Sequence, residues 1–169
     1  MNASADLQSA IAAILEVTGA LPVEAPVIRR REKEMTSDID AGLAVQNGLC
    51  LFVMPPVATS AVQGVPFVFF DGYEVRVRII ELPQMNTSGA DSYELIDAVA
   101  LALHWQPKSQ DTPATQMLAQ MLAHPLQIAR RPVEMIEGSA AAPGMPYDGK
   151  FLRIADVVFH AVLQINPAQ

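Results

Sequence analysis

The chain has 169 residues, of which 51% are hydrophobic and 17% charged, and its formal net charge is −7 at pH 7. This length corresponds to about one domain, which folds without disulfides, and the composition excludes an intrinsically disordered protein. The excess of acidic residues disfavours sequence recognition of nucleic acid and docking on an anionic membrane.

The cysteine count and the N-terminal sequence predict a protein that folds in a reducing cytoplasm. Cys50 is the single cysteine, so the chain forms no internal disulfide and no cysteine-based zinc site. No lysine or arginine precedes Arg29, which disfavours a secretory signal. The longest apolar stretch, residues 49–58, is shorter than the roughly 18–20 residues of a membrane-spanning helix.

The N-terminal third predicts two helices. Apolar residues recur at helical spacing over residues 5–18, with Ser4 as a capping residue and Gly19 as a terminating residue. Prolines then favour an extended connector over residues 20–27. A second, short helix is expected over residues 38–47.

The middle of the chain predicts strands. Residues 49–54 are continuously apolar, which is typical of a central strand that is buried on both faces. Residues 57–65 are expected to form a loop. Residues 67–70 and 73–81 are predicted to form a hairpin around a tight turn at Asp71 and Gly72, and one long bent strand is the alternative.

The clearest alternation in the chain lies in residues 73–81. One face carries Tyr73, Val75, Val77 and Ile79, and the other carries Glu74, Arg76 and Arg78. The two arginines either lie on an ordinary solvated face, or line a channel or form ion pairs between subunits. The mixed charge run over residues 29–34 has similar alternatives, a solvated face or a basic contact surface for a partner.

The C-terminal half predicts two more helices and two strands. Asp91 and Glu94 form a capping box for a helix that reaches Leu103, and Thr112 with Pro113 begins another that stops at His124 and Pro125. Residues 126–137 are expected to form a strand that Pro132 breaks at an edge or bulge. A loop over residues 138–150 and a strand over 151–165 follow.

The predicted fold is a single α+β domain over residues 1–169. Its mostly antiparallel sheet carries the helices on one face, as an α/β sandwich. The sequence offers no catalytic, cofactor-binding or metal-binding residues, because His104, His124 and His160 lack motif spacing and the glycines form no phosphate-binding loop. Cys50 is expected to be an inert core thiol, and the methionines at 117 and 121 to pack on a helix face, with a flexible partner-binding surface as the alternative.

The order of elements over roughly residues 1–105 resembles the tail-terminator or tail-completion proteins of long-tailed bacteriophages and phage-like particles. The resemblance rests on a short helix ending at Asn47 and Gly48, an apolar strand ending at Pro55 and Pro56, the alternating strand 75–81 followed by Pro83 and Asn86, and a helix from Tyr93 that ends in Leu103, His104 and Trp105. The final strand, residues 157–165, agrees with it.

The resemblance implies a structural protein without enzymatic activity. Such proteins fold as an α/β sandwich, form a six-membered ring on the end of the tail tube, stop tube growth and join the head or neck. It implies folding in a bacterial cytoplasm, incorporation into a virion or phage-like particle, and contacts with the tail tube protein and with a head or neck connector or sheath protein. Glu74, Arg76 and Arg78 would be ring-interface or lumen residues, and the small-residue-rich loops 55–66 and 138–150 would contact the tube.

Three alternatives stay open. One is another structural part of a contractile or tail-like particle, such as a neck or baseplate adaptor. A secretion chaperone is also small, acidic and cytoplasmic, but forms a dimer that holds an unfolded partner. A small enzyme would need polar groups that converge in a pocket.

Overall fold

The computed structural model describes residues 3–17, 19–29, 47–63, 69–104, 112–137 and 151–165. The helices are α1 (Ala3–Leu15), α3 (Ser92–Leu103) and α4 (Pro113–Met121), and the strands are β1 (Val27–Arg29), β2 (Leu49–Val53), β3 (Val57–Gln63), β4 (Phe69–Glu81), β5 (Gln127–Arg130), β6 (Val133–Glu137) and β7 (Phe151–Ile165). The expected helix over residues 38–47, apart from Asn47, and the loop over 138–150 lie outside the described residues.

Two long antiparallel strands, β4 and β7, form the middle of the sheet. They pair along the whole of β4, from Phe69 opposite Ile165 to Glu81 opposite Arg153. On its other edge, β4 pairs with β2 along one part of its length and with β3 along another. On its other edge, β7 pairs with β6 and β5 in the same way. Pro132 separates β5 from β6 at this outer edge, as the sequence predicts for a residue that cannot donate a ladder hydrogen bond.

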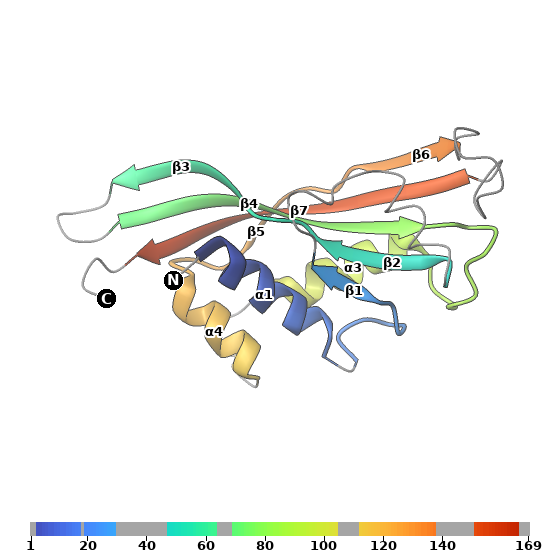
Figure 1. Ribbon diagram of the computed structural model, residues 1–169, viewed down its shortest axis with the longest axis horizontal. Helices are drawn as coiled ribbons and strands as arrows, with labels where there is room; N and C mark the ends of the chain where they lie inside the picture. Colours follow the sequence, from blue (N-terminus) through green and yellow to red (C-terminus); the bar gives the residue numbers. More distant parts are fainter. Residues whose placement is uncertain are drawn as a thin grey trace.

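The fold class agrees with the prediction, an α+β fold with a mostly antiparallel sheet. Among the described strands only β1 and β2 pair in parallel. The three described helices all lie on one face of the sheet (Figure 1). Figure 1 also shows that β3 and the adjacent ends of β4 and β7 extend past this helical layer.

The main hydrophobic core lies between the helices and the sheet. Val75, Val77 and Ile79 of β4 are fully buried there, as the alternation predicts, and they meet Leu7 and Ile11 of α1 in the same cluster. Burial of each large side chain contributes about 1.5–3 kcal/mol relative to exposure. This apolar seam holds the helices on the sheet.

A second apolar cluster occupies the opposite face of the sheet at its β2 end. It contains Cys50, Phe52, Met54, Ile80, Leu82 and Leu152. All five residues of β2 are therefore buried, which confirms a strand with two covered faces between β1 and β4. Cys50 is fully buried in this cluster, so its thiol is not accessible from solvent.

The prediction of a loop at residues 57–65 is wrong, because Val57–Gln63 form β3. The expected turn at Asp71 and Gly72 is also wrong, since both residues lie inside β4 and pair with Leu163 and Val162. The alternative of one long strand is correct. Gly72 instead marks an irregularity in the neighbouring strand, where the register of β3 shifts between Ala58 and Ser60.

The N-terminal elements differ from the prediction in their bounds. Helix α1 begins and ends earlier than expected, so Ser4 lies inside it and donates from its hydroxyl to the carbonyl of Pro56. The connector ends in β1, which the sequence did not predict. A strand of three residues has no detectable alternation, and β1 exists because it pairs with β2, with Val27 opposite Leu51.

The predicted caps of α3 and α4 are both present. One carboxylate oxygen of Asp91 accepts from the backbone N–H groups of Tyr93 and Glu94, each at 2.9 Å, and the Glu94 carboxylate accepts from the Asp91 N–H at 3.1 Å. Thr112 caps α4 in the same way, with Pro113 in its first turn. The first backbone N–H groups of a helix have no acceptor within the helix. In both helices the side chain of the capping residue accepts from one or more of these groups.

Asp91→Ala is expected to lower the free energy of unfolding by about 1 kcal/mol, the usual cost of losing an N-cap side chain. Chemical denaturation monitored by circular dichroism measures this change. Glu16→Ala is the control, because Glu16 is exposed in the turn after α1 and caps no helix start. An equal loss in both variants would contradict the capping role.

Candidate functional site

The outer face of the sheet, opposite the helices, carries the charged residues that the sequence singled out. Arg78 of β4 lies directly opposite Asp156 of β7. Its Nε and one terminal nitrogen donate to the two carboxylate oxygens of Asp156, at 2.9 and 3.1 Å. This two-bond geometry fixes both side chains, and Asp156 is only 8% exposed. Arg78 therefore joins the two central strands within one chain.

Arg76 and Glu74 continue this outer-face row along β4. Arg76 lies 3.5 Å from a carboxylate oxygen of Asp156 and 3.4 Å from one of Glu74. The same Glu74 oxygen accepts from Arg130 of β5 at 3.1 Å. The charged row, defined as Glu74, Arg76, Arg78, Arg130 and Asp156, thus crosses three strands and holds one more positive charge than negative.

The structure brings the three predicted residues together, but it does not place them on a simple solvated face. Arg78 is the most enclosed of the arginines in the charged row, whereas Arg76 and Arg130 keep about a third and about a half of their side chains exposed. Sequence reasoning missed Asp156 and Arg130, which lie on distant strands. Alternation alone puts Asp156 on a face of β7, but only the register places it opposite Arg78.

A second polar cluster is buried where α3 begins. Glu81, the last residue of β4, is only 3% exposed. Its carboxylate accepts from the Asn86 amide at 2.9 Å, from the backbone N–H of Ser92 at 3.0 Å and from Arg153 at 2.9 Å. The carboxylate therefore connects β4, β7 and the first residue of α3.

Arg153 completes this buried cluster from β7. Its guanidinium carbon lies 4.8 Å from the centroid of the Tyr93 ring, which is within range for a cation–π contact. Its Nε is buried and has no hydrogen-bond partner in the described part of the chain. Glu81 of β4 and Arg153 of β7 both bond to Ser92, the first residue of α3, and also to each other. These contacts anchor the start of α3 to the two central strands.

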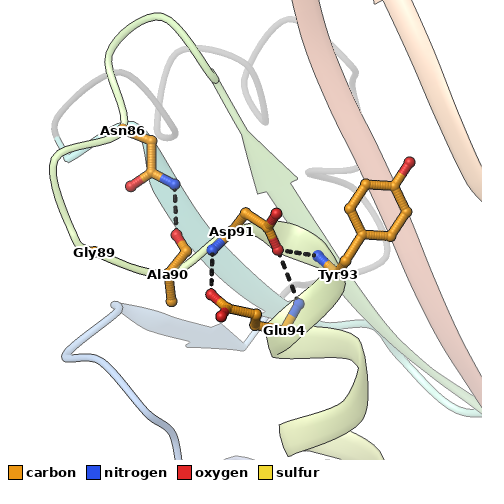
Figure 2. Close-up of a pocket in the computed structure, with 6 residues that line it drawn as sticks. All are labelled: Asn86, Gly89, Ala90, Asp91, Tyr93 and Glu94. Atoms are coloured by element: carbon orange, nitrogen blue, oxygen red, sulfur yellow. Dashed lines mark hydrogen bonds between the residues drawn. The ribbon is translucent and has the colours of Figure 1, made fainter.

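An open hollow of about 440 Å³ lies beside this anchor, lined by Asn86, Gly89, Ala90, Asp91, Tyr93 and Glu94. Figure 2 shows the Asn86 amide bonded to the Ala90 carbonyl and the Asp91 and Glu94 side chains turned back to the start of the helix. Because these carboxylates and Glu81 already occupy the N–H groups of Ser92, Tyr93 and Glu94, the helix start offers none of these donors to an anion.

The remaining chemistry-bearing residues are dispersed. His104, His124 and His160 are all exposed, and they lie at the end of α3, after α4 and on β7 respectively. In the described residues, no three histidine, cysteine, aspartate or glutamate side chains are grouped in a way that could hold a metal ion. No helix in that part of the chain is long and apolar enough to cross a membrane.

Comparison with known proteins finds similar folds among solved structures but no match by sequence. No protein-family model matches the sequence, and no curated protein matches it. A solved structure described as the virion of a native gene transfer agent particle contains a chain that is 15% identical, with a TM-score of 0.47; the match covers 98% of this chain and 100% of that one.

Proposed function

We propose that this protein is a structural component of a phage or phage-like particle, and specifically a tail-terminator-like protein that forms a hexameric ring on the end of the tail tube. The resemblance drawn from the sequence over roughly residues 1–105 supports this proposal, and the strands β2 and β4 and the helix α3 on which it rests are present. The protein would fold in the bacterial cytoplasm and enter the particle tail. Its partners would be its own copies, the tail tube protein and a head or neck connector or sheath protein.

The charged row on the outer sheet face is the observation that carries the proposal. Arg76 and Arg130 form ion pairs within the chain and still expose much of their side chains. Charged side chains of this kind can exchange partners when a second protein approaches, and they contribute to the specificity of a contact. The row therefore suits a ring interface or a lumen, with Arg78 held by Asp156 as its rigid part.

The principal alternatives predict other assemblies. A neck or baseplate adaptor would join the particle without terminating its tube. A secretion chaperone would form a fixed dimer, and it would keep one partner protein soluble.

The mass of the native protein, measured by light scattering over a wide range of concentrations, tests the proposal. A discrete mass of six chains that binds the ends of purified tail tubes is the expected result. A mass of one or two chains at every concentration, together with no binding to tube ends, would contradict it. A fixed dimer that solubilises a partner would support the chaperone instead.

A double variant, Arg76→Glu with Arg130→Glu, is expected to weaken the hexamer by at least about tenfold in association constant, because both exposed cations are reversed. Arg78 is left unchanged, since its loss would remove the two-bond partner of the buried Asp156 carboxylate. Glu16→Lys is the matched charge reversal at an exposed position after α1. An unchanged hexamer in the double variant, with native thermal stability, would remove the row from the interface.

A further inference from the structure

The exposed face of α3 has an unusual composition for a solvated helix. Tyr93, Asp97, Leu101 and His104 are all exposed and recur at spacings of three or four, so they share one side of the helix. Leu101 is 78% exposed, more than any other large apolar side chain in the described residues. We call these four residues, with Glu94 beside them, the α3 face.

The α3 face and the N-cap residue next to it are also acidic. Asp91, Glu94 and Asp97 lie at the start of the helix and in its middle, and α3 contains no lysine or arginine. The first two carboxylates accept hydrogen bonds from the helix start, but Asp97 points into solvent with its side chain 80% exposed. It forms a surface ion pair with Arg131, at 2.9 Å. A charged residue and a large apolar residue are thus exposed one turn apart.

The position of the α3 face relates it to one edge of the sheet. Arg131, which pairs with Asp97, follows β5 at the outer edge of β7. The strand at the other end of the sheet order is β1, where Arg29 is exposed and donates to Ser9. Arg29 begins the charge run of residues 29–34, which contains four basic and two acidic residues in a chain of net charge −7. Asp97 of the α3 face therefore lies beside the β5 end of the sheet, whereas Arg29, the first residue of the basic run, lies on the β1 strand at the other end.

We infer that the α3 face is a contact between copies of this chain, and that it receives the basic run beginning at Arg29 of a neighbouring copy. This inference rests on the proposed ring and names a contact of that ring in addition to the charged row. Two unlike, complementary surfaces at opposite ends of the sheet produce a head-to-tail contact, which closes into a ring when the rotation between copies allows it. Such a geometry differs from a two-fold dimer, in which the same surface meets itself.

The chemistry of the α3 face suits this occupant. Tyrosine and arginine are enriched at the centres of protein interfaces, and Tyr93 and Leu101 supply exposed apolar area beside the charges. Asp97 supplies an accessible carboxylate for a neighbouring guanidinium. Since the attraction is partly between exposed charges, the contact weakens as ionic strength rises.

Separate variants locate the contact. Asp97→Lys and, in a second protein, Arg30→Glu combined with Arg31→Glu are each expected to reduce the association constant of the native oligomer by at least about tenfold. Leu101→Ser is expected to act in the same direction without a change of charge. Glu16→Lys, an exposed charge reversal outside both α3 and residues 29–34, is the control that should leave the oligomer unchanged. Analytical ultracentrifugation at two salt concentrations measures all four.

Mixing the two charge-reversed proteins decides whether the contact joins different copies. Each protein alone brings like charges together at every contact. In an alternating ring of the two, the lysine introduced at position 97 faces the introduced glutamates, and the unchanged Asp97 faces the unchanged arginines. The mixture is therefore expected to form the oligomer with an association constant close to that of the wild-type protein and at least about tenfold above that of either variant alone. Failure of the mixture, or an unchanged oligomer in Asp97→Lys, would overturn the inference.

These outcomes separate the inference from the proposed function. A wild-type hexamer that Asp97→Lys leaves intact would overturn the α3 contact and preserve the ring proposal. A wild-type protein that stays monomeric and does not bind tube ends would overturn the ring proposal, and with it the inference.

Discussion

Glu81→Ala is expected to destabilise the protein by about 3–5 kcal/mol, the usual cost of removing one partner from a buried ion pair. The carboxylate is 3% exposed and accepts from Asn86, Ser92 and Arg153. Its loss leaves a guanidinium and a backbone N–H without this acceptor in a buried place. Urea denaturation monitored by circular dichroism gives the free energy of unfolding.

Two comparisons sharpen this prediction. Glu81→Gln keeps the shape and one acceptor oxygen, so it should cost less than alanine. Glu74→Ala also removes a carboxylate from β4, but the partners of this carboxylate, Arg76 and Arg130, lie near the surface. This variant should lower the free energy of unfolding by no more than about 1 kcal/mol. If Glu81→Ala and Glu74→Ala destabilise equally, Glu81 does not anchor α3.

Gly48→Ala is expected to cost about 2–5 kcal/mol, because two penalties act at the same residue. Gly48 has φ +70°, a left-handed conformation that costs a residue with a side chain about 1–2 kcal/mol. A Cβ atom there would also lie 2.5 Å from the backbone nitrogen of Asn86 and 2.6 Å from the carbonyl carbon of Met85. Backbone atoms cannot rotate away, so the turn after β4 must move, as in an overpacked core.

Gly89→Ala is the matched control for this prediction. Gly89 has φ +91°, but a Cβ atom there would meet no atom within 4 Å. It should therefore show the conformational penalty alone, about 1–2 kcal/mol. Urea denaturation of both variants separates the two penalties. Equal losses would mean that the approach of Gly48 to the 85–86 backbone does not constrain the fold.

Both large effects converge on the connection between β4 and α3. Gly48 accepts through its carbonyl from the N–H of Leu82 at 2.8 Å, and Glu81 holds Asn86 and the first residue of α3. The turn that joins β4 to α3 is therefore held by both Gly48 and Glu81, and it sets the direction in which α3 leaves the sheet. If α3 carries the contact between copies, these two positions affect assembly through the placement of the helix.

Local pattern predicted the elements whose determinants lie close together in the sequence. The caps at Asp91 and Thr112 depend on residues within one helical turn, and the alternation of β4 and the length of β7 depend on neighbours two positions apart. The break at Pro132 follows from its missing N–H. These features are properties of short stretches, so the sequence by itself determined them.

Tertiary contacts decided the features that require two distant stretches. Asp71 and Gly72 have the residue types of a turn, yet the pairing of β4 with both β3 and β7 keeps them extended. β1 and β3 exist because a neighbouring strand supplies their hydrogen bonds, which no local propensity encodes. The partners of Arg78 and Glu81 were undetermined for the same reason: strand register, a property of the assembled sheet, brings Asp156 and Arg153 opposite them.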